Sequence, residues 1–159
     1  MKLTKIETPP RTRIDTTVGT RVFAGNTMIF GDTGWRDITE NLQDGWTETA
    51  KVKRENNRVS LLLNVRPPAH LVGTARNTRR RLLLLPNGFF STGHLVYQGR
   101  GAGDQNGMPI PIDMGYAINM LDIRNSSHDS GVWTSSKMVV SFTFETDSAW
   151  PTSLPGIPV

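Results

Sequence analysis

Residues 51–65 read KVKRENNRVSLLLNV, and this segment gives the strongest indication of the fold class. From position 59 onward every second residue is apolar or aliphatic, which is the period of a β-strand with one buried face. The polar run Glu55-Asn56-Asn57 interrupts the stretch with residues that favour a turn. The sequence therefore predicts an antiparallel hairpin, and the core-facing side chains of its second strand are Val59, Leu61, Leu63 and Val65.

Similar patterns extend in both directions from this hairpin. The turn Gly25-Asn26 separates two short apolar segments, 21–23 and 27–30, and predicts a second hairpin. A single helical turn is predicted at 40–42. Many short strands without a long helix indicate an all-β fold, an antiparallel β-sandwich or barrel with an extended N-terminal arm. The remaining predicted strands are 81–85, 93–97, 108–114 (an edge strand or an extended segment, because it contains prolines), 116–123 and 137–144.

Composition narrows the class of protein. The chain has 159 residues, of which 36% are hydrophobic and 20% charged, and this suits one domain plus an appendage. Cysteine is absent, so disulfides and thiolate metal sites are excluded. The sequence contains no apolar run of the roughly 18 residues that predict a transmembrane helix. No apolar run follows the first lysines as a secretory signal requires. We therefore expect synthesis in a cytoplasm and no insertion into a membrane.

Residues 1–20 are predicted to form an extended basic arm, and residues 21–159 a β-rich module with an extended C-terminal tail. Pro9-Pro10 excludes a helix in the arm. The formal net charge of the chain is +4, and a positive arm suits an acidic protein surface or nucleic acid. No aromatic residue is interleaved for stacking on bases, so nucleic acid is not the expected partner. We expect the arm to anchor the module to neighbouring proteins through Lys2, Lys5, Arg11 and Arg13.

No motif in the sequence points to catalysis. The histidines at positions 70, 94 and 128 do not have the spacing of metal ligands. A Gly-x-Ser-x-Gly motif, which exposes a nucleophilic serine, is absent. The glycines of 99–103 lack the Gly-Lys-Ser/Thr ending of a phosphate-binding loop. We therefore expect neither an enzyme nor a bound cofactor or metal.

The tryptophans are candidates either for the core or for a sugar-binding platform. We expect most of them to bury area in the core or in an interface. Trp35 stands between Asp32 and Asp37, so two alternatives stay open. A carbohydrate-binding module predicts an exposed tryptophan beside polar groups in a concave site. A glycan hydrolase predicts two carboxylates facing each other across a cleft. The full set is Trp35, Trp46, Trp133 and Trp150.

Several segments of the sequence resemble one known family. Residues 31–39 read GDTGWRDIT and are followed by DGWT at 44–47. Residues 85–89 read LPNGF, and residues 150–156 read WPTSLPG. In this order and spacing the segments resemble the C-terminal β module of minor tail proteins from actinobacteriophages, and the hairpin at 51–59 is similar to the next hairpin of that module. The resemblance spans residues 21–156.

The resemblance implies a structural virion component of a tailed bacteriophage. It implies a trimeric minor tail protein exposed near the tail tip, bound to other virion proteins and able to contact a host-surface glycan. Members of the family carry the module at the end of longer chains, whereas an arm of 20 residues precedes it here. A capsid decoration protein of the same virion therefore stays open as an alternative, and a carbohydrate-binding module as a further one. The family provides no catalytic residues.

Two polar, glycine-bearing segments between predicted strands, 98–107 and 125–131, are expected to be solvent-exposed loops. Loops at the rim of a rigid β scaffold commonly make the contacts with other molecules. The residues that we expect to contact another surface there are Arg100, Asp104, Asn106 and His128.

Overall fold

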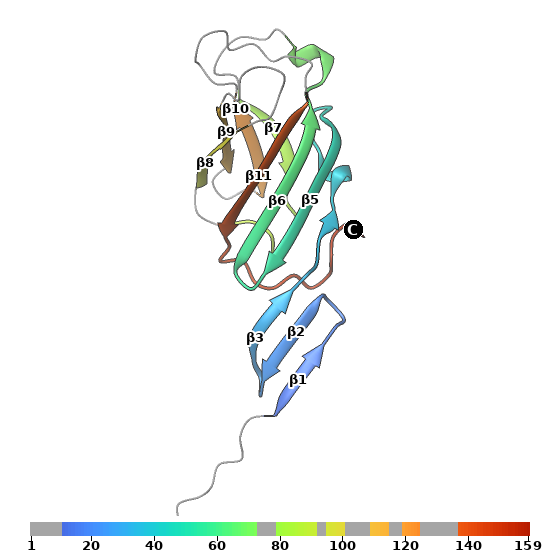
Figure 1. Ribbon diagram of the computed structural model, residues 1–159, viewed down its shortest axis with the longest axis vertical. Coiled ribbons are helices and arrows are strands. Elements are labelled where there is room, and N and C mark those ends of the chain that lie inside the picture. Colours follow the sequence, from blue (N-terminus) through green and yellow to red (C-terminus); the bar gives the residue numbers. More distant parts are fainter. Residues whose placement is uncertain (1–10, 73–78, 92–94, 101–108, 115–118, 125–136) are drawn as a thin grey trace, which may run out of the picture.

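The computed structural model describes residues 11–72, 79–91, 95–100, 109–114, 119–124 and 137–159 (Figure 1). The described elements are β-strands and two short 3-10 turns, η1 (Thr39–Asn41) and η2 (Ala69–Leu71). The predicted all-β class is confirmed. In the described part of the chain, no helix is long and apolar enough to cross a membrane. The strands are β1 (Thr12–Asp15), β2 (Thr20–Ala24), β3 (Thr27–Asp32), β4 (Arg36–Asp37), β5 (Thr47–Glu55), β6 (Arg58–Arg66), β7 (Arg79–Leu84), β8 (Leu95–Arg100), β9 (Pro109–Met114), β10 (Met120–Arg124), β11 (Met138–Glu145) and β12 (Ile157–Pro158).

The strands form two antiparallel sheets. In the larger sheet β5 pairs with β6 and β6 pairs with β11. The other edge of β5 pairs with β3 and β4, from which β2, β1 and β12 continue the sheet. The smaller sheet has the order β7-β10-β9-β8. Figure 1 shows β5, β6 and β11 in front of this smaller sheet, and one cluster of buried side chains contains residues of both layers.

The core lies between the two layers, and β6 runs through its centre. The predicted core positions of β6 (Val59, Leu61, Leu63 and Val65) are each at most 1% exposed, which confirms the predicted alternation. Neighbouring residues in register share a face of the sheet, and Leu61 lies between Val52 on β5 and Phe142 on β11, both buried. The smaller sheet supplies the opposite wall of the core with Leu82, Leu83, Leu121 and Ile123.

Several local predictions are confirmed and one loop boundary is wrong. The predicted second hairpin is β2–β3 around the turn Gly25-Asn26. The helical turn predicted at 40–42 is η1, one residue earlier. The loop predicted from residue 98 begins later, because β8 continues in register with β9 as far as Arg100. Residues 101–107 of that predicted loop lie outside the described residues.

The prediction of an edge strand at 108–114 is wrong, because β9 lies between β8 and β10. β8 pairs with all of residues 109–114, whereas β10 pairs only with residues 112–114. Pro109 and Pro111 therefore precede the ladder with β10, and their missing N–H groups remove no bond from it. The prolines are tolerated in an inner strand because the second neighbour begins after them.

Strands β1, β2 and β3 (residues 12–32) project beyond the sandwich, and we call them the extension (Figure 1). Only the last residue of β3, Asp32, pairs with β5. Gly31 is the sole buried residue of the extension, and a Cβ atom at this position would lie 2.6 Å from the ring of Trp150. Trp150 also donates a hydrogen bond from Nε1 to the carbonyl of Val18 (3.2 Å). This indole, together with two hydrogen bonds between Gly31 and Asn56 (both 2.8 Å), therefore fastens the extension to the sandwich.

Candidate functional site

The turn at 85–89 and the start of the C-terminal tail meet around one buried cation, Arg54 of β5. Its side chain is 4% exposed in the midst of backbone carbonyls. Nη1 donates to the carbonyls of Gly88 and of Ala149 (2.8 Å), and Nη2 donates to that of Ser148 (2.9 Å). The guanidinium lies 5.1 Å from the centre of the Trp150 ring. Burial lowers the pKa of Arg54. These contacts tie the turn at 85–89 and the start of the C-terminal tail to the β5–β6 hairpin.

The C-terminal tail is held along β4 by Arg36 in the same way. Its Nε donates to the carbonyl of Pro155 and its Nη2 to that of Gly156, both at 2.8 Å. Gly156 has φ +51° and packs directly on the carbonyl of Asp37, so it leaves no room for a side chain. The glycines, arginines and tryptophan of these segments therefore close one end of the sandwich. These residues stabilise the fold, and the candidate binding surfaces lie elsewhere on the molecule.

The extension carries an apolar face that the described residues leave uncovered. Ile14, Val22 and Phe30 are neighbours in register on β1, β2 and β3 and so share this face. Ile14 is 67% exposed, and the other two are half-buried. Ile29, 58% exposed, is the extra residue of a β-bulge between β2 and β3. Exposed apolar patches on a folded domain mark contacts with another molecule.

The opposite face of the extension is charged and internally paired. Arg21 Nη2 lies 2.7 Å from Asp15 Oδ2, and Arg13 Nη1 lies 3.7 Å from the same oxygen. The guanidinium of Arg13 lies 4.3 Å from the ring centre of Phe23. Hydrogen bonds from Thr17 to Asp15, helped by the two arginines, lower the pKa of Asp15. The charged side chains of this face therefore pair with one another within the extension.

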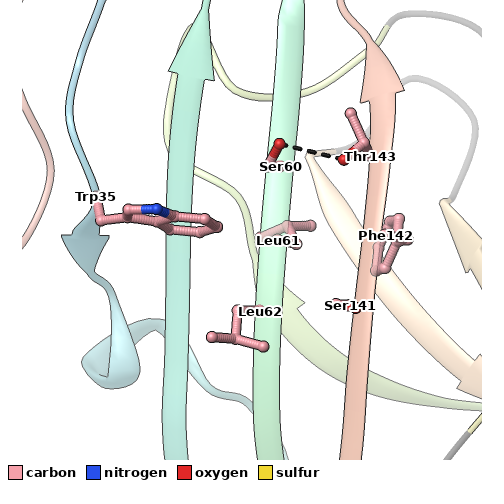
Figure 2. A pocket seen from close by; sticks show the side chains of 7 residues that line it. All are labelled: Trp35, Ser60, Leu61, Leu62, Ser141, Phe142 and Thr143. Atoms are coloured by element: carbon pink, nitrogen blue, oxygen red, sulfur yellow. Dashed lines mark hydrogen bonds between the residues drawn. The ribbon is translucent and has the colours of Figure 1, made fainter.

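A second candidate surface is a hollow on the outer face of β5, β6 and β11, beside Trp35 (Figure 2). Its volume is about 500 Å³. Leu61 and Phe142 contribute to its floor although their side chains are buried on the core side of the sheet. The outward side chains are those that alternate with the core positions. They are Ser60 and Leu62 on β6 and Ser141 and Thr143 on β11, with Trp35 at the side.

The turn before β4 presents Trp35 to this hollow. The Asp32 carboxylate accepts the N–H of Gly34 (2.7 Å), and Gly34 has φ +65°, a conformation that favours glycine. The carbonyl of Trp35 accepts the N–H of Val159 (3.2 Å), which fixes the backbone from the other side. The indole is 37% exposed, and Figure 2 shows its ring extended across β5 toward β6.

The charged side chains next to Trp35 form ion pairs and hydrogen bonds with their neighbours. Lys53 Nζ lies 3.2 Å from Asp32 and 3.4 Å from Glu55, and the hydrogen bond with Asp32 is the main reason that the pKa of Lys53 is raised. Asp37 accepts the N–H of Thr39 (2.9 Å), and hydrogen bonds from Thr39 lower the pKa of Asp37. A general acid in a glycan hydrolase needs a raised carboxyl pKa, which is the opposite of the direction found for Asp37. The two aspartates that flank Trp35 therefore stabilise turns and ion pairs.

The predicted site residues are only partly within the described chain. Arg11 is exposed at its start, Arg13 is in β1, and Arg100 ends β8. His70 is in η2, and in the described ranges no group of acidic or histidine side chains could hold a metal ion. Of the other tryptophans, Trp46 is buried (4% exposed) and Trp150 is half-buried. The predicted positions outside the described residues are Lys2, Lys5, His94, Asp104, Asn106, His128 and Trp133.

Both candidate surfaces include residues that sequence analysis did not single out. Leu62 and Val139 (39% and 40% exposed) stand at outward positions of strands whose other face is core. An apolar residue at a position where the alternation predicts a polar one is the sequence signal that could have identified them. Leu62 comes to line the hollow with Trp35 through strand pairing over long sequence distances, and Val139 stands on the same outer face of β11 outside the hollow. In comparisons with protein-family models, curated proteins and solved structures, none matches this chain.

Proposed function

We propose that this protein is a structural component of a tailed-phage virion, a minor tail or tail-tip protein, which joins the particle through its extension. The phage assignment rests on the resemblance of four short sequence segments and of the hairpin at 51–59. The assembly role rests on one structural observation, the apolar face of the extension with Ile14 at 67% exposure. A three-stranded sheet needs a hydrophobic face packed on another layer for stability, and a neighbouring subunit supplies that layer in this proposal.

The edge of the extension offers a second mode of contact. Among the described strands β1 pairs only with β2, so its other edge presents backbone N–H and C=O groups. An added strand from a neighbour would pair with this edge through main-chain hydrogen bonds. Arg11 and the 60% exposed side chain of Arg13 stand beside it and suit acidic groups of the neighbour. Apolar burial and edge pairing together make the extension a docking element for a trimer or for a larger assembly.

Ile14→Lys and Ile29→Lys test this proposal. Both side chains are exposed in the single chain, so the thermal midpoint of unfolding should change by no more than a few degrees. A charged side chain in a buried interface should lower association at least about tenfold. Ile157→Lys is the matched control, because Ile157 is 68% exposed but lies on β12, away from the extension.

The measurements are the oligomeric state by analytical ultracentrifugation and the incorporation of each variant into phage particles. We expect the wild type and Ile157→Lys to assemble, and the two extension variants to remain unincorporated monomers. Normal assembly of both extension variants would refute docking through this face. A capsid decoration protein would use the same extension on a different lattice, so copy number per particle, low at a tail tip and high over a capsid, separates these two alternatives.

A further inference from the structure

We propose that the hollow beside Trp35 binds a neutral sugar residue of a glycan, with the pyranose ring stacked on the indole. The hollow, about 500 Å³, is within the usual size range of sites for small ligands. It lies on the outer face of β5, β6 and β11, whereas the proposed docking face is on the extension. The inference therefore goes beyond the assembly role and stands or fails separately from it.

The indole provides the stacking surface. An aromatic face carries partial negative charge, and the axial C–H groups of a pyranose carry partial positive charge, so the two attract when stacked. Trp35 is available because it is 37% exposed. Its backbone is held on one side by the turn at Asp32 and on the other by the hydrogen bond from Val159. A platform that is fixed before binding loses little entropy on binding.

Hydroxyl groups line the hollow opposite the indole. Ser60 Oγ and Thr143 Oγ1 lie 3.1 Å apart and share one hydrogen bond (Figure 2). Each hydroxyl has one donor and two acceptor positions, so the pair keeps one O–H donor and several acceptor positions for a ligand. In the next row Ser141 on β11 adds a further hydroxyl, and its partner in register, Leu62 on β6, adds an apolar contact. This alternation of apolar and hydroxyl groups matches the surface of a sugar.

Charge and apolar area favour a sugar over the other classes of occupant. Lys53 is paired with Asp32 and Glu55. Lys51, the register neighbour of Leu62, lies opposite Asp37 in the ladder between β4 and β5. Both cations beside the hollow therefore have acidic neighbours, which oppose the attraction of an anionic polymer. The centre of a protein interface is usually continuous apolar surface. Here the exposed apolar side chains Leu62 and Val139 are interrupted by the hydroxyl of Ser141, their neighbour in the sheet. A neutral glycan complements this mixed surface better than a second copy of the chain.

The test is a titration of the purified chain with the methyl glycosides of glucose, galactose, mannose and N-acetylglucosamine. Two-dimensional NMR follows the Trp35 indole N–H, which reports on stacking directly. We expect saturable binding in the millimolar range, as usual for one sugar on an open site. Trp35→Ala should weaken it at least about tenfold, and Trp35→Phe, which keeps an aromatic face, should retain most of it. Thr143→Val, which keeps the shape and removes the hydroxyl, should weaken it about fivefold.

Ile157→Ala is the control variant, since it changes an exposed side chain outside the hollow. Thermal unfolding of each variant excludes loss of fold as the cause, and Thr143→Val keeps the test valid if Trp35→Ala does not fold. Absence of saturable shifts at the Trp35 indole with all four sugars would overturn the proposal. Binding that is unchanged in Trp35→Ala and Thr143→Val would also overturn it. Self-association that depends on Trp35 would instead identify the hollow as a protein interface and refute the sugar assignment.

Discussion

The sandwich and the extension are built from the same kind of strand but differ in what covers them. In β6 alternate side chains are buried to 1% exposure or less, because a second sheet packs on them. In the extension Gly31 is the sole buried residue, and Ile14 on its apolar face is 67% exposed. Folding is driven mainly by burial of apolar area. The sandwich therefore carries its own stability, whereas the extension has an apolar surface that we propose another molecule covers.

The largest effect that separates the two regions is expected from the core. Leu63→Ala removes a fully buried side chain and should lower the free energy of unfolding by about 3 kcal/mol. Leu62→Ala is the matched control on the same strand, since Leu62 is 39% exposed, and it should cost less than about 1 kcal/mol. Urea denaturation measures both. Equal losses would mean that the two faces of β6 are packed alike.

Arg54→Met is expected to have nearly as large an effect, because it leaves carbonyls of two segments without their donor. We expect a loss of about 3 kcal/mol in the free energy of unfolding. Proteolysis should then begin near Ala149, since the guanidinium no longer holds the tail. Arg58→Met, at an exposed position of the same hairpin, is the control and should be close to neutral. An unchanged tail in Arg54→Met would contradict the role given to this arginine.

The smallest effect is a pH dependence inside the extension. The pKa of Asp15 is lowered in the folded chain, so its contribution to stability is present above the ordinary carboxyl pKa. That contribution is lost as the pH falls through the lowered value. Amide exchange in β1 and β2 should therefore accelerate, relative to the intrinsic rate, below about pH 4. Asp15→Asn should remove this response and Asp44→Asn, at an exposed turn, should keep it. The same response in Asp15→Asn would assign it to another group.

Sequence analysis predicts the regions whose structure depends on local pattern. The alternation at 59–65 gives the core face of β6, and Gly25-Asn26 gives the turn of the β2–β3 hairpin. Sequence analysis fails where segments far apart in the chain determine the position or the burial of a residue. The place of β9 inside its sheet depends on where β10 begins to pair. Arg54, which stands among charged neighbours in KVKRE, is buried only because loops from 94 and 95 residues further along the chain cover it.

For the candidate surfaces too, sequence analysis predicts what depends on local pattern and misses what depends on long-range strand pairing. The sequence leaves Trp35 open as a sugar platform beside the expected core or interface role, but the hydroxyls opposite it come from β6 and β11, whose register is long-range. The predicted anchor at 1–20 includes Arg13 and Ile14, yet the apolar face also needs Val22 and Phe30 from the following hairpin. Residue type is visible in the sequence, whereas the grouping of residues on one face is a product of strand pairing.

Cryo-electron microscopy of intact particles is the most direct test of the proposal that this protein is a virion component docked through its extension. We predict that a neighbouring subunit packs on the apolar face of the extension, with Ile14 and Ile29 buried at the contact and the sandwich directed outward. A particle in which the extension projects into solvent, and in which the protein is held by another surface, would contradict it.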